Sequence, residues 1–173
     1  KYKEPEYAIS TYKKGRKLLK GTYPFNFELA QVYGLQGKTQ LMLDEYLGLL
    51  DYNKSYLQSV QNALQTNLNP DENGKKKAML KKLLVERIQQ NPDKKLFSEM
   101  LIWVYIQEEN FGGAFVQAKA LDRRLKEDGN RIASLAKLAT ENSDYSTAVK
   151  CYEYLISKGA NNYFYITSKI EIV

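Results

Sequence analysis

The chain has 173 residues, with 26 Lys and Arg against 20 Asp and Glu, so its formal net charge is +6. Hydrophobic residues make up 43% and charged residues 27%, which are the proportions of a folded globular protein and not of a disordered or collagen-like one. The absence of histidine excludes histidine-dependent catalytic triads and imidazole metal sites. The single cysteine, Cys151, excludes an internal disulfide and any CxxC motif.

No apolar run approaches the roughly 18 residues that are needed to cross a bilayer. The first residues, KYKEPEYAISTYKKG, contain no apolar stretch of the kind found in a signal peptide. We therefore expect a soluble chain, and the sequence does not decide between a cytoplasmic and a periplasmic location.

Apolar residues at helical spacing predict helices throughout the chain and no sheet. In chain order the predicted helices cover residues 5–20, 23–35, 38–50, 53–66, 74–90, 94–108, 111–127, 130–142, 145–158 and 162–172. The polar stretch 67–74 predicts a long turn. Asn142, Ser143 and Asp144 are suitable N-caps for the helix that follows them, and Gly129 and Gly159 predict C-terminal stops.

The sequence also contains an internal repeat. Segments 101–121 and 135–155 superimpose without gaps at an offset of 34 residues, which places Ala114 on Ala148 and Phe111 on Tyr145. Segment 29–49 has the same pattern, and half a repeat precedes it. Each full unit is predicted to be two helices joined by a short polar turn.

This period and helix–turn–helix pattern resemble the tetratricopeptide repeat family over nearly the whole chain. The match is best at Leu135-Ala136, Tyr145, Ala148 and Tyr152. The repeats are degenerate, because Met42, Leu80 and Ile102 stand where the family has small residues. The resemblance implies an all-α, right-handed α-solenoid of antiparallel helix pairs over residues 1–173, with Tyr145 and Tyr152 packed between helices. Because the predicted helix 162–172 is too apolar for a capping helix, we expect a segment of a longer array or an end that docks onto another chain.

The resemblance further implies recognition in a concave groove formed by the first helix of each pair. We therefore predict a non-catalytic scaffold or adaptor that binds a protein or peptide partner and needs no cofactor or metal. The predicted groove-facing residues are Phe27, Gln31, Glu99, Trp103, Gln107 and Lys137. Trp103 is the predicted anchor, and packing between helices is its alternative. A clamp for a partner's terminal carboxylate is not expected, since these positions offer a single cation, Lys137.

Clustered lysines support a second hypothesis, binding to nucleic acid or to an anionic membrane surface. Residues 1–20 hold seven Lys and Arg against two Glu, and residues 71–95 hold eight against four acids. A solvated helix face explains such lysines as well, and no nucleic-acid-binding motif accompanies them, so this hypothesis ranks second. An enzyme ranks third, because acidic pairs such as Glu108/Glu109 lie at predicted helix ends and Cys151 is expected to be a small buried hydrophobe.

Overall fold

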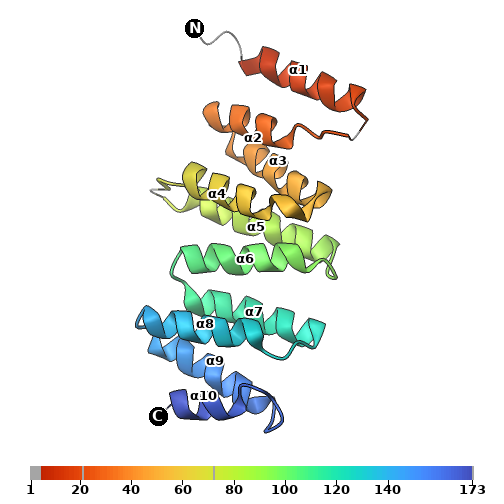
Figure 1. The fold of residues 1–173 in the computed structure, drawn as a ribbon. Coiled ribbons are helices and arrows are strands. Elements are labelled where there is room, and N and C mark those ends of the chain that lie inside the picture. The colour runs from red at the N-terminus through yellow and green to blue at the C-terminus, as the bar shows by residue number, and fades with distance from the viewer. Residues whose placement is uncertain (1–4, 21, 72, 173) are drawn as a thin grey trace. The chain divides into compact units, whose positions relative to one another are not determined.

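The computed structural model describes residues 5–20, 22–71 and 73–172 (Figure 1). Within these ranges it contains ten α-helices, one short 3-10 helix and no strand, so the all-helical prediction is confirmed. The contacts divide the chain into two compact units, Lys1–Leu83 and Leu84–Val173, each with a core of its own.

The first unit is built from four α-helices, one short 3-10 helix and the first part of a fifth α-helix. They are α1 (Pro5–Leu18), α2 (Asn26–Leu35), α3 (Thr39–Tyr52), the 3-10 helix η1 (Lys54–Tyr56), α4 (Leu57–Asn67) and α5 (Lys75–Gln90), which continues into the second unit. The helices α2 and α3 form the closest pair, joined by a turn in which Gly37 takes the left-handed conformation at φ 67°. The helix α1 packs on α2, and α4 packs on α3.

The core of the first unit follows from apolar residues three or four positions apart. Leu29 and Tyr33 of α2 are buried against α3, where Leu43, Tyr46, Leu47 and Leu50 are essentially inaccessible to solvent. Val60 and Leu64 of α4, which also packs on α3, are fully buried. The helix α3 thus contacts both α2 and α4.

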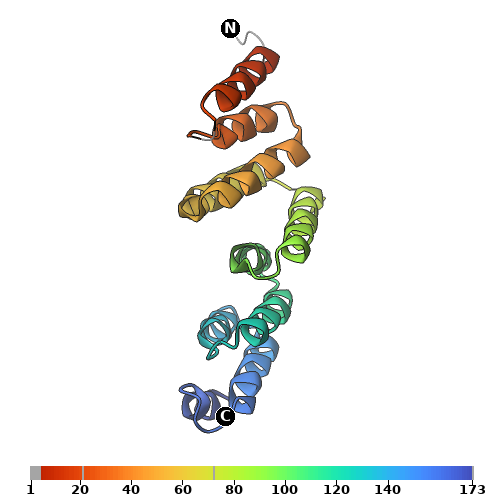
Figure 2. The same cartoon turned by 90° about the vertical axis from the view of Figure 1, so that its right-hand side faces the viewer.

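The second unit contains α6 (Lys95–Gln107), α7 (Phe111–Leu125), α8 (Asn130–Glu141), α9 (Tyr145–Ser157) and α10 (Tyr165–Glu171). Each of these helices packs on the next one in the chain. Figure 2 shows α6, α8 and α10 on one side of this row and α7 and α9 on the other. One cluster of buried residues, including Ile132, Leu135 and Leu155, runs through α6 to α9.

The turns before α7 and α9 are conformational copies of each other at an offset of 34 residues. Glu109 and Ser143 both take the left-handed conformation, at φ 54° and 62°. The next residue caps the following helix in both turns: Oδ1 of Asn110 accepts from the backbone N–H of Gly113 at 2.8 Å, and Oδ1 of Asp144 accepts from that of Thr147 at 3.0 Å. The predicted cap at Asp144 is therefore confirmed, and the sequence period corresponds to a repeated local structure.

Several details differ from the sequence predictions. The predicted helix 53–66 begins with the 3-10 turn of η1, because the side chain of Asn53 accepts from the N–H of Ser55 and shapes a tighter turn. Gly129 does not end α7. That helix ends at Leu125 with Lys126 in the left-handed conformation, and Gly129 instead precedes α8. Gly159 follows α9 at φ 97°, as predicted.

The prediction for Tyr145 is wrong. As the first residue of α9 it is 63% exposed, although the buried Ala148 and Tyr152 follow it three and seven residues later on the same helix. Near the C-terminal end, Ile166 and Ile170 are 64% and 68% exposed on the side of α10 opposite to buried Ser168.

Candidate functional site

The two N-terminal residues of the predicted site, Phe27 and Gln31, lie one turn apart on α2 and line the same groove. The groove has a volume of about 710 Å³, within the range of ligand-binding sites. It is lined by Phe27, Gln31, Gly34 and Leu35 of α2, Tyr46 of α3, and Ser59, Asn62, Ala63, Thr66 and Asn67 of α4. The intervening helix α3 thus supplies the floor, while α2 and α4 supply the walls.

A polar network holds the start of α2, and therefore Phe27, in place. Asn26 is buried and donates from Nδ2 to the backbone oxygen of Glu45 at 3.1 Å and to its carboxylate at 2.7 Å. The same carboxylate forms a 2.6 Å ion pair with Arg16 of α1, whose Nε donates to the backbone oxygen of Pro24 at 2.5 Å. Three segments of the unit are joined at one carboxylate, so the wall formed by α2 is well fixed.

The floor of the groove is aromatic. Tyr46 is fully buried, and its ring meets that of Phe27 edge-to-face with centroids 5.7 Å apart. Burial raises the pKa of the Tyr46 hydroxyl above its ordinary value, and the nearby amide of Asn67 opposes this. Phe27 is only partly buried and offers apolar surface at the groove, whereas Gln31 next to it is exposed.

The far wall is polar and carries no charge. Its side chains, Ser59, Asn62, Thr66 and Asn67, come from one face of α4. The wall approaches α2 at Gly34, where a β-carbon would lie 3.2 Å from Oδ1 of Asn67. Among the residues that the structure describes, none that lines this groove is charged.

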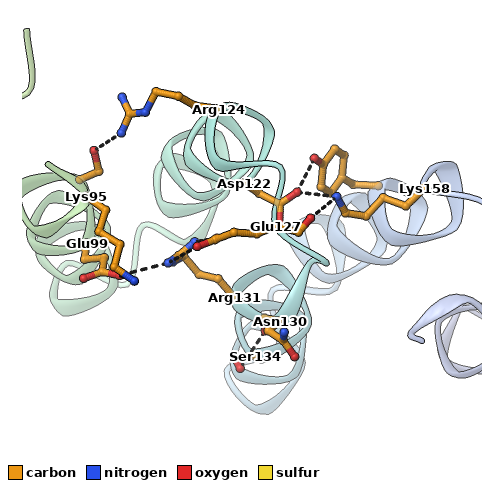
Figure 3. Close-up of polar contacts among 11 residues, drawn as sticks. Lys95, Glu99, Asp122, Arg124, Glu127, Asn130, Arg131, Ser134 and Lys158 are labelled. Atoms are coloured by element: carbon orange, nitrogen blue, oxygen red, sulfur yellow. Dashed lines mark hydrogen bonds and ion pairs between the residues drawn. The ribbon is translucent and has the colours of Figure 1, made fainter. Parts of the chain in front are cut away.

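The remaining predicted site residues lie in the second unit, where Glu99 takes part in an ion-pair network (Figure 3). Its carboxylate lies 3.1 Å from Nη2 of Arg131 on α8 and 3.8 Å from Nζ of Lys95 one turn earlier. Arg131 is also paired with Glu127, which precedes α8. Glu99 therefore connects α6 to α8 and is not a free acid facing a partner.

Trp103 and Gln107 follow Glu99 on α6 at intervals of four residues, whereas Lys137 lies on α8. Trp103 is partly buried in the middle of α6, and Gln107 is exposed at its last residue. Lys137 is exposed and lines a second groove, of about 460 Å³, whose described lining includes neither Trp103 nor Gln107. This second groove is built like the first, with walls from α8 and α10 and a floor from α9. It is lined by Ala133, Lys137, Thr140, Glu141, Tyr152, Leu155, Phe164, Thr167, Ser168 and Glu171.

The sequence reasoning missed a buried charged group at Asp122. This α7 carboxylate is fully buried, accepts from the hydroxyl of Tyr154 at 2.8 Å and forms a 2.7 Å ion pair with Lys158. Its other oxygen, Oδ1, has no hydrogen-bond partner among the described residues. A signal was present in the sequence, since Asp122 continues the apolar stripe of Ala114 and Ala118 at a spacing of four.

Cations of the two lysine clusters are partly engaged in structural contacts. Lys13 lies over the ring of Tyr33 at 5.9 Å, and Nζ of Lys76 donates to the backbone oxygens of Asn67 and Pro70. Arg87 and Lys94 both lie over the ring of Phe97. Residues 1–4 of the first cluster lie outside the described residues.

Cys151 is buried in α9, as predicted, and its chemistry is that of an inert thiol. Burial, helped by the negative charge of Asp144, raises the pKa of the thiol to about 12, so it carries almost no thiolate near neutral pH. No group of three or more Cys, Asp or Glu among the described residues has the arrangement of a metal site. None of the described helices is both long and apolar enough to span a membrane.

Comparison with protein-family models finds no match, and comparison with curated proteins finds no relative.

Proposed function

We propose that this chain is a non-catalytic binding module, a scaffold or adaptor, that holds a protein or peptide partner in the groove between α2 and α4. The observation that carries the proposal is the meeting of Phe27 and Gln31 with the polar, uncharged face of α4 over a buried aromatic floor. Apolar surface with a few convergent polar groups is the common composition of a binding groove. The fixed start of α2 reduces the ordering that binding would require.

We further propose that the helix pairs belong to a tetratricopeptide-like, right-handed solenoid. The repeat of the turn before α7 in the turn before α9 supports this, as does the shared construction of the two grooves. Under this proposal the groove at Lys137 is a second inner surface. The acidic Glu141 and Glu171 in its lining make it prefer partner segments of a different charge from those that suit the uncharged first groove.

A peptide selection with a groove-blocking variant tests the proposed function. Random 12-residue peptides are displayed and selected on the wild-type chain, and the enriched peptides are then measured on Ala63→Arg. Ala63 lines the groove, so the larger side chain occupies the space of a partner. Ala120→Arg is the matched control, because Ala120 is exposed in the middle of α7.

The expected result is at least one peptide family whose binding is lost in Ala63→Arg and kept in Ala120→Arg. Circular dichroism melting of both variants shows whether each is folded. Enriched peptides that bind both variants equally, or a complete lack of enrichment, would count against the groove as a binding site.

A further inference from the structure

The wall formed by α4 belongs to the longest stretch of sequence without a charged residue in the first unit. Residues 55–70 include no Asp, Glu, Lys or Arg, although 27% of the whole chain is charged. The stretch is nevertheless largely solvent-facing, since Ser59, Asn62, Gln65 and Thr66 are all exposed. Exposed helix faces ordinarily carry charged side chains, so an exposed face with amides and hydroxyls alone calls for a reason.

The opposite wall is also nearly free of charge. Glu28 is the one charged residue of α2, it does not line the groove, and its Oε1 accepts from the hydroxyl of Tyr23 at 2.5 Å. A charged partner segment would therefore lose water on entering the groove and meet no opposite charge there. An uncharged segment does not have this cost, so the groove favours a neutral occupant.

The side chains that line the walls have the hydrogen-bonding character of a peptide main chain. An amide side chain both donates and accepts, and so does each residue of a polypeptide backbone. Among the described residues, the side-chain amide of Gln31 on one wall and the hydroxyl of Ser59 on the other have no hydrogen-bond partner. Both groups therefore remain available to a backbone that lies between the walls.

The spacing along α4 sets the length of such a segment. Ser59, Asn62, Ala63 and Thr66 lie on one face of the helix, and the seven residue-to-residue steps from the first to the last span about 10 Å at 1.5 Å per step. A fully extended peptide advances about 3.3 Å per residue, so about three residues fit along the wall.

The floor separates a peptide from other neutral ligands. Binding of a sugar or a base commonly uses the exposed face of an aromatic ring, but the ring of Tyr46 is fully buried and packs edge-to-face with that of Phe27. What reaches the groove is the partly exposed side chain of Phe27, which suits an apolar side chain of the bound segment.

We infer that the groove between α2 and α4 binds an uncharged, extended, internal stretch of polypeptide, about three residues long, chiefly through its main chain. The amide of Gln31 and the hydroxyl of Ser59 bond the backbone from opposite walls, and one apolar side chain of the stretch packs on Phe27. No free terminus and no charged side chain is needed. This inference rests on the proposed function, because it names the partner chemistry of the same groove.

The test uses the tightest peptide that binds wild type and Ala120→Arg but not Ala63→Arg. The peptide is synthesised once with free ends and once with an acetylated N-terminus and an amidated C-terminus. A second series places Glu or Lys at each position in turn. A third series methylates each backbone nitrogen in turn. Affinity for the full chain is measured by isothermal titration calorimetry. The variant Gln31→Ala removes one proposed backbone contact, and Gln40→Ala removes an exposed amide from α3 as its control.

Blocking both ends is expected to change the affinity by less than about twofold. Methylation at the contact positions, and the variant Gln31→Ala, are each expected to weaken binding roughly two- to tenfold, the effect of one lost hydrogen bond. Glu and Lys are both expected to weaken binding at the same positions, and Gln40→Ala is expected to have no effect.

Four outcomes would overturn the inference and leave the proposed function standing. They are loss of affinity on blocking the ends, tighter binding with Glu or Lys at the contact positions, insensitivity to backbone methylation, and equal effects of Gln31→Ala and Gln40→Ala. If no peptide depends on the groove but neutral oligosaccharides bind wild type and fail to bind Ala63→Arg, both the inference and the proposed peptide function are overturned.

Discussion

Asp122 and Lys158 form a 2.7 Å ion pair in which the carboxylate is fully buried and the lysine side chain is 20% exposed. Lys158 also donates to the backbone oxygen of Glu127 at 2.7 Å, and Tyr154 donates to the same carboxylate oxygen as Lys158. The pair therefore ties the C-terminal part of α7 and the residues after it to the end of α9, one repeat later in the sequence (Figure 3).

Replacing Lys158 with Met is expected to destabilise the chain by about 3 kcal/mol or more, because it leaves the buried carboxylate of Asp122 without its counter-charge. The measurement is the free energy of unfolding in urea at pH 7.5. Lys150→Met is the control on the same helix, since Lys150 is exposed, and it is expected to change the free energy by less than about 0.5 kcal/mol.

The double variant Asp122→Asn with Lys158→Met separates the charge effect from the loss of packing. It is expected to be more stable than Lys158→Met alone, because the neutral amide no longer carries a buried charge. If the two single effects simply add, the stabilisation does not come from the pairing of these charges.

The stabilisation by the Asp122–Lys158 pair is expected to be lost at high pH. Burial by itself lowers the pKa of Lys158, but the hydrogen bond and the charge of Asp122 outweigh it and raise the pKa above its ordinary value. The pKa of Tyr154 is raised as well, by burial and then by Asp122. Groups whose pKa is raised in the folded state stabilise it fully below their unfolded values of about 10 to 10.5, and this contribution is lost as the pH rises through the folded values.

The free-energy difference between wild type and Lys158→Met is therefore expected to be constant from pH 7 to 9 and to shrink above about pH 10. Urea unfolding of both proteins at pH 7.5, 9 and 11 measures it, and taking the difference cancels the other lysines and tyrosines. A difference as large at pH 11 as at pH 7.5 would contradict this assignment.

Local patterns explain why the helices could be predicted. The expected ranges 111–127 and 130–142 correspond to helices Phe111–Leu125 and Asn130–Glu141, because the apolar period and the cap residues both belong to the segment itself. Phe27 and Gln31 could be placed together for the same reason, since residues four apart share a helix face.

Contacts between helices could not be predicted from the same patterns. Glu99 was assigned to a groove, but Arg131, 32 residues later, takes its carboxylate, and no local period indicates that pairing. The α4 wall was missed because its polar side chains form part of a site only where α2 lies opposite. Tyr145 was misplaced because a matched repeat position does not reveal which neighbour covers it.

Cys151 is expected to be unreactive in the folded chain. Its side chain is fully buried, and its pKa of about 12 leaves almost no thiolate at pH 8. In 6 M guanidinium at pH 8, Cys151 is expected to react fully with Ellman's reagent and to release one equivalent of the coloured thiolate of the reagent. In buffer at pH 8, the reaction is expected to be only as fast as the second unit opens. Rapid stoichiometric reaction in buffer would show that α9 is not packed as described.

Gly129 and Gly159 form a matched pair for measuring how tightly α8 and α9 pack. Both take the left-handed conformation, at φ 95° and 97°, so alanine carries a similar backbone cost of about 1–2 kcal/mol at either position. A β-carbon at residue 129 would overlap Cδ2 of Leu155, whereas at residue 159 no atom lies within 4 Å. Gly129→Ala is therefore expected to lower the free energy of unfolding by at least about 1 kcal/mol more than Gly159→Ala.

Adding Leu155→Ala to each glycine variant tests whether overlap with Leu155 causes the extra cost of Gly129→Ala. Removing the overlapping methyl groups is expected to abolish the excess cost of Gly129→Ala, so that the two glycine substitutions cost the same in that background. If the excess persists without the leucine side chain, the cost at residue 129 arises from the backbone and not from the close approach of α8 to α9.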